Sequence, residues 1–209
     1  MFSLQASHSF DDHLGFDPST MSRLLGALMD RIECGVMACG PEGQLYHANV
    51  AARRELAVAS VLRLSHGRVE CPMGGPEAWH SALYAAAVRL RSSLISLGQG
   101  EQRLMLALTP VQIGAGDQPA AVVMMGRRAL CSPLGLEMLS NSHGLTSAER
   151  RVLQALIDNR SVREIAESHG VTVATVRTQI QAAREKLGVR SIDALLLRAA
   201  EVPPVTARH

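Results

Sequence analysis

Residues 171–189, VTVATVRTQIQAAREKLGV, predict a helix with two different faces. At 100° per residue, Ile180, Ala183 and Leu187 fall within about 40° of Val176 and form a narrow apolar stripe. Away from this stripe lie long hydrogen-bond donors and a hydroxyl group, on Arg177, Thr178, Gln181 and Arg184. Glu185 is almost the only acid among them, whereas a merely solvated face usually mixes charge signs. We therefore expect the outward face to contact an anionic partner.

The sequence around this stretch predicts further short helices. Thr146 with Glu149, and Ser161 with Glu164, have the spacing of capping boxes, and Gly170 stands where a helix ends. Buried stripes are predicted at Val152, Leu153, Leu156 and Ile157, and then at Ile165 and Ala166. Residues 164–187 have the pattern of a helix-turn-helix, with Ala166 at the helix crossing and Val171 filling the gap. A last helix follows Ser191, so four helices are expected over residues 144–200.

A major groove of B-DNA admits one such helix, which sets the expected roles. In this pose Arg177 donates to guanine, and Thr178 and Gln181 contact neighbouring bases. The predicted phosphate contacts are Arg163, Thr172, Thr175, Arg184 and Lys186.

The segment LTSAERRVLQALIDNRSVREIAESHGVTVATVRTQIQAAREKLGVRSIDALL resembles the LuxR/FixJ-type (GerE-like) DNA-binding domain of bacterial transcription regulators. The resemblance covers about a quarter of the chain and implies the same groove-facing residues, Arg177, Thr178 and Gln181. It also implies a dimer contact on the last helix, at Ala194, Leu195 and Leu197. Asn159 replaces a glycine common in the family, and as the next-best residue for a left-handed helix end it preserves the turn.

Two other interpretations of this segment stay open. A helical module that binds another protein would use the same caps and apolar stripe, but it would not need the face of cations and hydroxyls. VATVRTQIQAAREKL also resembles the last helix of a sigma-factor helix-turn-helix. Such a factor needs an aromatic-rich domain to melt promoter DNA, and only 3% of the residues of the whole chain are aromatic. The fourth helix also favours the LuxR type.

Residues 21–128 predict a mixed α+β domain. Apolar residues at helical spacing start at Met21. Val36–Cys39 and Gln44–His47 read as a hairpin, Asn49 caps a helix, His66–Gly67 form a second turn, and Pro76 starts an alanine-rich helix. Three strand-like runs follow at 94–97, 102–113 and 120–126. The segment LLGALMDRIECGVMACGPEGQLYHANVAARREL resembles the start of a PAS domain, which implies a five-stranded antiparallel sheet.

The front domain is expected to sense a signal or to mediate dimerisation. Trp79, Tyr84, Met105 and Met124 are candidate lining residues of a small-molecule cavity, although at this spacing such residues more often form plain core. RLMLALTPV predicts a strand buried on both faces or covered by a partner. No cofactor is expected: His80 lies on an alanine-rich helix, where a histidine is usually structural rather than a haem ligand, and the reactive-cysteine motif of a flavin photoreceptor is absent.

Composition excludes several classes of protein. The chain has 209 residues, and no apolar run approaches the roughly 20 residues that span a bilayer. The N-terminus lacks the features of a signal peptide, so a cytoplasmic location is expected. Four cysteines fit no metal-ligand spacing and predict reduced thiols, with no metal site. The sequence contains no nucleophile and base in the pattern of a catalytic site, so no enzyme is predicted. An alternative is a front domain that descends from an enzyme and still turns over a small molecule. Such a domain would need a cavity lined by carboxylates with shifted pKa values, and the candidates are Glu70, Glu77, Glu101 and Asp117.

These observations predict a two-domain DNA-binding transcription regulator. The expected divisions are a flexible arm at 1–20, a PAS-like domain at 21–128, a linker at 129–143, the helix-turn-helix domain at 144–200 and a tail at 201–209. A short helix between Ser132–Pro133 and Asn141–Gly144 is expected in the linker. The predicted partners are double-stranded DNA and a second copy of the chain, with RNA polymerase as a further candidate and no membrane.

Overall fold

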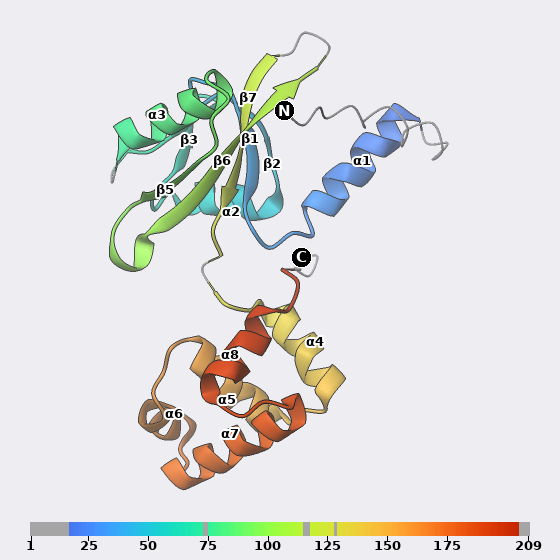
Figure 1. Ribbon diagram of the computed structural model, residues 1–209, viewed down its shortest axis with the longest axis vertical. Helices are drawn as coiled ribbons and strands as arrows, with labels where there is room; N and C mark the ends of the chain where they lie inside the picture. The colour runs from blue at the N-terminus through green and yellow to red at the C-terminus, as the bar shows by residue number, and fades with distance from the viewer. Residues whose placement is uncertain (1–16, 73–74, 115–117, 128, 205–209) are drawn as a thin grey trace.

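The computed structural model describes residues 17–72, 75–114, 118–127 and 129–204, apart from the side chain of Glu101 (Figure 1). Most of the predicted N-terminal arm, residues 1–16, lies outside this range. So do Asp117 and residues 205–209 of the predicted tail. Within the described residues, no helix is both long enough and apolar enough to cross a membrane.

Sheet and helices alternate over the front part of the chain, as the sequence predicts (Figure 1). The elements are α1 (Pro18–Met29), β1 (Val36–Cys39), β2 (Leu45–Ala48), α2 (Val50–Val58), β3 (Arg63–Ser65), β4 (Arg68–Glu70), α3 (Pro76–Ala87), β5 (Ser93–Leu97), the short 3₁₀ helix η2 (Gly100–Gln102), β6 (Leu104–Ile113) and β7 (Gln118–Met125). The β3–β4 turn places His66 and Gly67 at positive φ, 48° and 77°, which suits a two-residue hairpin.

Five strands form one antiparallel sheet in the order β2-β1-β7-β6-β5. The two halves of the domain therefore meet at the centre of the sheet, where β1, early in the chain, pairs with β7, the last strand. α3 packs against β5, β6 and β7, so it covers one face of the sheet. This arrangement is the PAS-like α+β fold that the sequence predicts.

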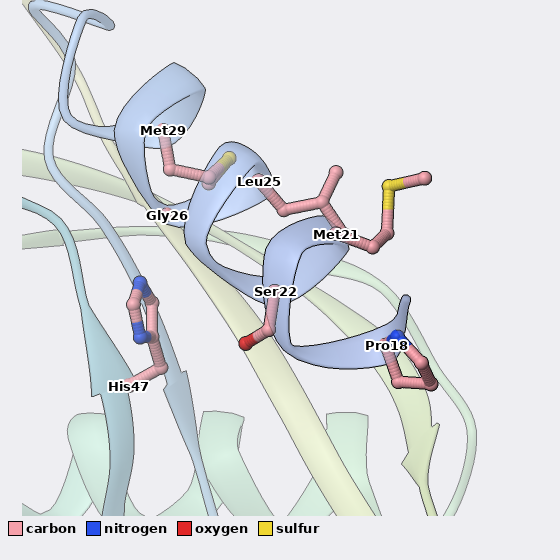
Figure 2. A pocket seen from close by; sticks show the side chains of 7 residues that line it. All are labelled: Pro18, Met21, Ser22, Leu25, Gly26, Met29 and His47. Atoms are coloured by element: carbon pink, nitrogen blue, oxygen red, sulfur yellow. The ribbon is translucent and has the colours of Figure 1, made fainter. Parts of the chain in front are cut away.

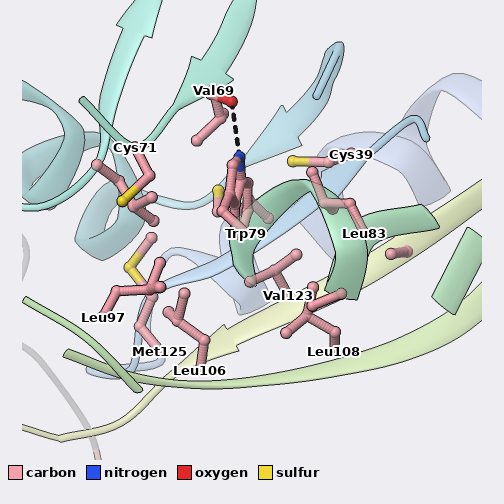
Figure 3. Packing of buried hydrophobic residues seen from close by; sticks show 14 of the residues in the cluster. Cys39, Val69, Cys71, Trp79, Leu83, Leu97, Leu106, Leu108, Val123 and Met125 are labelled. Atoms are coloured by element: carbon pink, nitrogen blue, oxygen red, sulfur yellow. Dashed lines mark hydrogen bonds between the residues drawn. The ribbon is translucent and has the colours of Figure 1, made fainter. Parts of the chain in front are cut away.

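The first core lies between this sheet face and the helices (Figure 3). Trp79 on α3 is fully buried, and its indole N–H donates to the Val69 carbonyl oxygen at 2.9 Å. Strand residues alternate, with Leu104, Leu106 and Leu108 facing this core. A buried aromatic with a satisfied N–H fixes the hairpin β3–β4 against α3.

The predicted small-molecule cavity is wrong, because its four lining residues do not face one space. Trp79 is core, whereas Tyr84 on α3 is 47% exposed. Met105 and Met124 are 46% and 47% exposed on the opposite face of the sheet. The prediction failed because strand alternation sends odd and even positions to opposite faces, and the sequence alone did not say which face α3 covers. The same alternation corrects the prediction that the β6 stretch is buried on both faces within its own chain. Leu104, Leu106 and Leu108 are buried on one face, and Met105 is exposed on the other.

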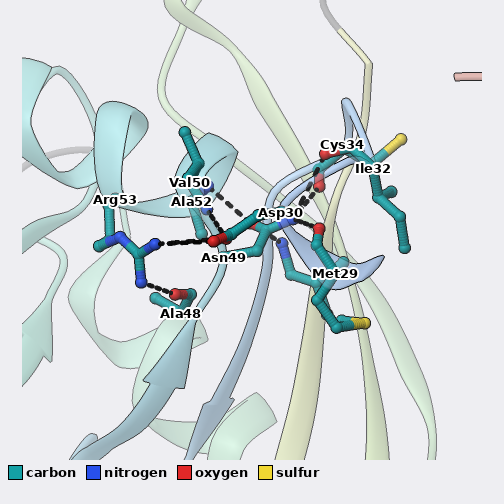
Figure 4. A network of polar contacts seen from close by, with 10 residues as sticks. Met29, Asp30, Ile32, Cys34, Ala48, Asn49, Val50, Ala52 and Arg53 are labelled. Carbon is teal, nitrogen blue, oxygen red and sulfur yellow. Dashed lines mark hydrogen bonds and ion pairs between the residues drawn. The ribbon is translucent and has the colours of Figure 1, made fainter. Parts of the chain in front are cut away.

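Asn49 connects three elements at the base of the sheet (Figure 4). Its side-chain oxygen accepts from the backbone N–H groups of Ala52 at 2.9 Å and Val36 at 3.0 Å. Its side-chain nitrogen donates to the carbonyl oxygens of Met29 at 3.0 Å and Cys34 at 2.9 Å. The predicted helix cap is confirmed, and the same amide also anchors the chain between α1 and β1.

All four cysteines are free, and Cys39, Cys71 and Cys131 are buried. Burial raises the pKa of Cys39 to about 12, which keeps this thiol protonated at neutral pH.

The rest of the described chain is helical: α4 (Pro133–His143), α5 (Ser147–Ile157), α6 (Val162–His169), α7 (Val173–Leu187) and α8 (Ile192–Ala200). These helices share a second core, which includes Leu136 and Leu139 of α4. The segment predicted as a linker is therefore mostly a helix, and its apolar side chains pack with α5 to α8. The sequence predicted this helix but not its packing into the core, because only two of its leucines, Leu136 and Leu139, are buried.

Candidate nucleic-acid interface

The caps that the sequence predicts hold α5, α6 and α7 in place. Thr146 and Ser161 each receive a backbone N–H bond at 3.3 Å, while Glu149 and Glu164 accept from the cap backbone at 2.8 and 2.7 Å. Both capping boxes are confirmed. Thr172 caps α7 by accepting from the Thr175 N–H at 3.1 Å.

The turns between these helices use left-handed backbone. Gly170 and Gly188 have φ of 65° and 68°, and Asn159 has φ of 60°. The prediction that asparagine preserves this helix end is confirmed. Val171, however, does not fill the gap between the helices, because it is 38% exposed. Val173, two residues on, packs against the core instead.

One face of α7 is buried and the other is open. Val176, Ile180, Ala183 and Leu187 are at most 5% exposed, which confirms the predicted stripe. Arg177, Thr178 and Gln181 are all exposed on the remaining surface.

The three predicted base-contacting residues differ in their present partners. The Arg177 guanidinium has no hydrogen-bond or ion-pair partner among the described residues. Thr178 donates its hydroxyl to the Ala174 carbonyl oxygen at 3.1 Å, and Gln181 donates to Glu185 at 2.7 Å. Arg177 therefore has all its donors available to an external ligand, while Gln181 must first exchange an intrahelical bond.

The two cations of α7 that were predicted to contact phosphate, Arg184 and Lys186, bind groups of the protein itself. Arg184 is half-buried and donates to the Arg190 carbonyl oxygen, which ties α7 to the turn before α8. Lys186 donates to the Glu149 carboxylate at 2.7 Å and to the Gly144 carbonyl oxygen at 3.0 Å. Arg163, Thr172 and Thr175 are exposed, and the hydroxyls of the two threonines share a hydrogen bond at 2.9 Å. Nothing in the sequence signalled the Lys186–Glu149 pair, since its partners are 37 residues apart.

Electrostatics around Glu149 follow from this pairing. Its carboxylate is 8% exposed, and burial works to raise its pKa. Hydrogen bonds from Lys186 and Thr146 outweigh burial, so the pKa of Glu149 lies below its ordinary value. The lone lysine of the chain thus holds a buried carboxylate in its charged form.

The predicted dimer contact on α8 needs one correction. Leu195 is fully buried in the second core, so its side chain cannot meet a partner. Leu197 is 62% exposed and Ala194 is half-buried. The run of apolar residues in this helix concealed which positions face inward.

An open groove and a smaller pocket lie among the described residues of the front part. An open groove of about 700 Å³ runs between α1 and β2, lined by Pro18, Met21, Ser22, Leu25, Gly26, Met29 and His47 (Figure 2). A smaller pocket of about 200 Å³ includes Glu33, Glu55 and Arg127 among its lining residues. Burial raises the pKa of Glu33, whereas Arg127, 3.9 Å away, works to lower it. The sequence analysis did not predict Glu33 or Glu55 as pocket residues. Of the carboxylates that it did predict, Glu70 pairs with Arg63 at 3.0 Å, and Glu77 lies in the first turn of α3.

The class defined by this geometry is a helix-turn-helix domain joined to a PAS-like domain. Residues 143–187 match the family model of sigma-70, region 4. That match ends before α8, and the fourth helix is the feature that agrees with the LuxR-type resemblance. The chain is also 32% identical over 79 residues to the transcriptional regulatory protein DesR of Bacillus subtilis (strain 168). This match covers 38% of the chain and 40% of the length of DesR.

Similar solved structures cover nearly the whole chain. The VqmA–ligand–DNA complex of Vibrio cholerae is 18% identical with a TM-score of 0.40, covering 88% of this chain and 90% of that one. The phage VqmA–DPO complex is 16% identical with a TM-score of 0.35, covering 89% and 93%.

Proposed function

We propose that this chain is a sequence-specific DNA-binding transcription regulator that acts as a homodimer. The observation that carries the proposal is the outward face of α7, where the exposed Arg177 has no partner within the described residues. In a helix-turn-helix domain this face enters the major groove. The name of DesR, a transcriptional regulatory protein, supports the same function.

The proposed roles follow the exposed residues. Arg177 donates to guanine O6 and N7, and Thr178 and Gln181 contact adjacent base edges. Arg163, Thr172 and Thr175 contact phosphates. Arg184 and Lys186 leave the predicted set because their charged groups are paired with a carbonyl oxygen and a carboxylate of the protein. Two copies would place their α7 helices in successive major grooves roughly 34 Å apart.

The PAS-like domain supplies regulation or dimerisation in this proposal, and no catalytic reaction is assigned to it. We keep the division at 21–128, and we extend the helix-turn-helix unit to include α4. A regulator that reads DNA works in the bacterial cytoplasm. RNA polymerase is a second candidate partner, favoured by the match to sigma-70, region 4.

Selection of binding sites from random duplex DNA tests the proposal. The full chain should recover a two-fold symmetric motif, and Arg177→Ala should lose preference at one base pair of each half-site, worth about 1–3 kcal/mol of discrimination. Arg68→Ala is a matched control, because it removes one exposed arginine that pairs with Glu42 in the front domain. Random recovery by the wild-type chain, or an unchanged motif with Arg177→Ala, would contradict the proposed function.

A further inference from the structure

Glu185 is an acid on a helix whose exposed face otherwise carries cations, amides and hydroxyls. It is exposed, and a carboxylate on the face that meets DNA repels the phosphates. Its sequence neighbours Arg184 and Lys186 are cations, but they bind a carbonyl oxygen and another carboxylate of the protein. Within the part of the chain that the structure describes, Glu185 therefore forms no ion pair. Its presence on α7 needs a different explanation.

The contact that Glu185 does make is with Gln181, one helical turn earlier. Nε2 of Gln181 donates to Oε1 of Glu185 at 2.7 Å. A carboxylate can only accept, so the amide atom that faces Glu185 has to be the nitrogen of Gln181. The amide oxygen branches away from that nitrogen, and it has no partner among the described residues. Glu185 thus fixes which end of the Gln181 amide is left for an external ligand.

The places of the two residues along α7 (Val173–Leu187) give them different roles. Gln181 lies four residues after Arg177, and Glu185 lies four residues further on, about 12 Å from Arg177 along the helix axis. The N-terminal part of a recognition helix meets the base edges. Gln181 lies in the middle of α7, whereas Glu185 lies in its last turn. Glu185 therefore acts on base recognition through Gln181, without touching a base itself.

We propose that Glu185 is a positioning residue that makes Gln181 present its amide oxygen to the major groove, so that this position selects adenine or cytosine. In the major groove adenine N6 and cytosine N4 are donors, whereas guanine O6 and thymine O4 are acceptors. A glutamine that is not held can turn either end of its amide to the groove and accept all four bases. Since Gln181 reads a base only if α7 enters the groove, this role of Glu185 rests on the proposed function.

Selection of binding sites from random duplex DNA by the full chain tests this role. Gln181→Ala identifies the position that Gln181 reads, because the wild-type preference for adenine or cytosine should be lost there alone. Glu185→Ala releases the amide and should weaken the preference at that position by about three- to tenfold. Glu185→Lys replaces the acceptor with a donor, which attracts the oxygen of Gln181 and leaves its nitrogen for the groove. The preference should then change to guanine or thymine.

Two controls separate the orientation of the amide from the charge at position 185. Glu185→Gln removes the charge but keeps an oxygen that accepts from Gln181, so it should retain most of the wild-type preference. Glu167→Lys makes the same change of charge on the exposed face of α6 and should leave the preferred base unchanged. Circular dichroism checks that each variant keeps its helices.

The possible outcomes distinguish this role from the proposed function. An unchanged preference with Glu185→Ala or Glu185→Lys would overturn the role of Glu185. A wild-type preference for guanine or thymine at the position that Gln181→Ala identifies would overturn it as well. So would a motif that Gln181→Ala leaves intact, while the test of Arg177 still stands. Random recovery by the wild-type chain would refute the proposed function and, with it, the role of Glu185.

Discussion

Individual side chains on α6 and α7 divide into those that face outward and those that hold the domain together. Arg163 and Arg184 both looked like phosphate contacts in the sequence, but only Arg163 is exposed and without a partner among the described residues. Arg184 instead binds the Arg190 carbonyl oxygen. The sequence pattern does not distinguish an exposed, unpaired arginine from one that binds a turn of the same domain, so this distinction needed the structure.

Arg163→Ala and Arg184→Ala should therefore act differently. Arg163→Ala should weaken binding to all DNA sequences and reduce the slope of log K against log salt by about 1. Arg184→Ala should leave that slope unchanged and lower the free energy of unfolding by about 1 kcal/mol, since it removes one hydrogen bond at the turn. Salt titrations of DNA binding, with urea denaturation of both variants, measure these effects. Equal salt slopes for the two variants would return Arg184 to the phosphate-contacting set.

The Lys186–Glu149 pair predicts how stability depends on pH. The pKa of Glu149 is lower in the folded chain than its ordinary value of 4.5, so the folded state binds this proton less tightly. Its stabilising contribution is then fully present above about pH 5 and is lost as pH falls through the lowered pKa. Lys186→Met leaves a mostly buried carboxylate without its cation and should cost about 1–3 kcal/mol at pH 7.

That cost should shrink at low pH, where a protonated Glu149 needs no cation. Urea denaturation at pH 7 and in steps toward pH 3 measures the difference between variant and wild type. Lys186→Arg is the control, since it keeps the charge and should recover most of the stability. A difference that stays constant with pH would show that Lys186 acts through packing and not through its charge.

At the scale of elements, local signals predicted most of the architecture. Asn49, Thr146, Ser161 and Thr172 all cap the helices that the sequence assigned to them. A cap acts within four residues of its helix, so the chain alone reveals it. Which face of an element is covered depends on partners far along the chain. For this reason the predictions for the cavity residues and for Leu195 were wrong, while the prediction of the apolar stripe of α7 was right.

Asn49 is the element-scale residue with the largest predicted effect. Asn49→Ala removes the cap of α2 and the donors that hold the chain after α1, and it should cost about 2–4 kcal/mol. Asn49→Ser keeps a capping oxygen but no amide donor, so it should recover only about 1 kcal/mol of that loss. Thermal denaturation of the two variants measures the split. If Ser restores full stability, the bonds to the Met29 and Cys34 carbonyl oxygens contribute nothing.

For the whole molecule, the two cores define separate units joined near residue 130. The first core uses sheet, α2 and α3, and the second uses α4 to α8 with Cys131. Contacts do cross between them, because the Glu33 N–H donates to the Pro204 carbonyl oxygen at 2.8 Å. Arg127, on the connection, lies 3.9 Å from Glu33. Such a small polar junction permits the two units to change their relative placement, which is what regulation by the front domain would require.

Because α4 contributes to the second core, it should stabilise the DNA-binding unit even without the front domain. A fragment of residues 129–204 should unfold cooperatively, and a fragment of residues 144–204 should be less stable by about 3–6 kcal/mol, the contribution of burying Leu136 and Leu139 at about 1.5–3 kcal/mol each. Urea denaturation of both fragments measures the difference. Leu136→Ala in the longer fragment should lose about 2–4 kcal/mol, whereas Met138→Ala, at a site 53% exposed on the same helix, should change little. Equal stability of the two fragments would mean that α4 is a spacer, as the sequence first indicated, and that the DNA-binding unit starts at α5.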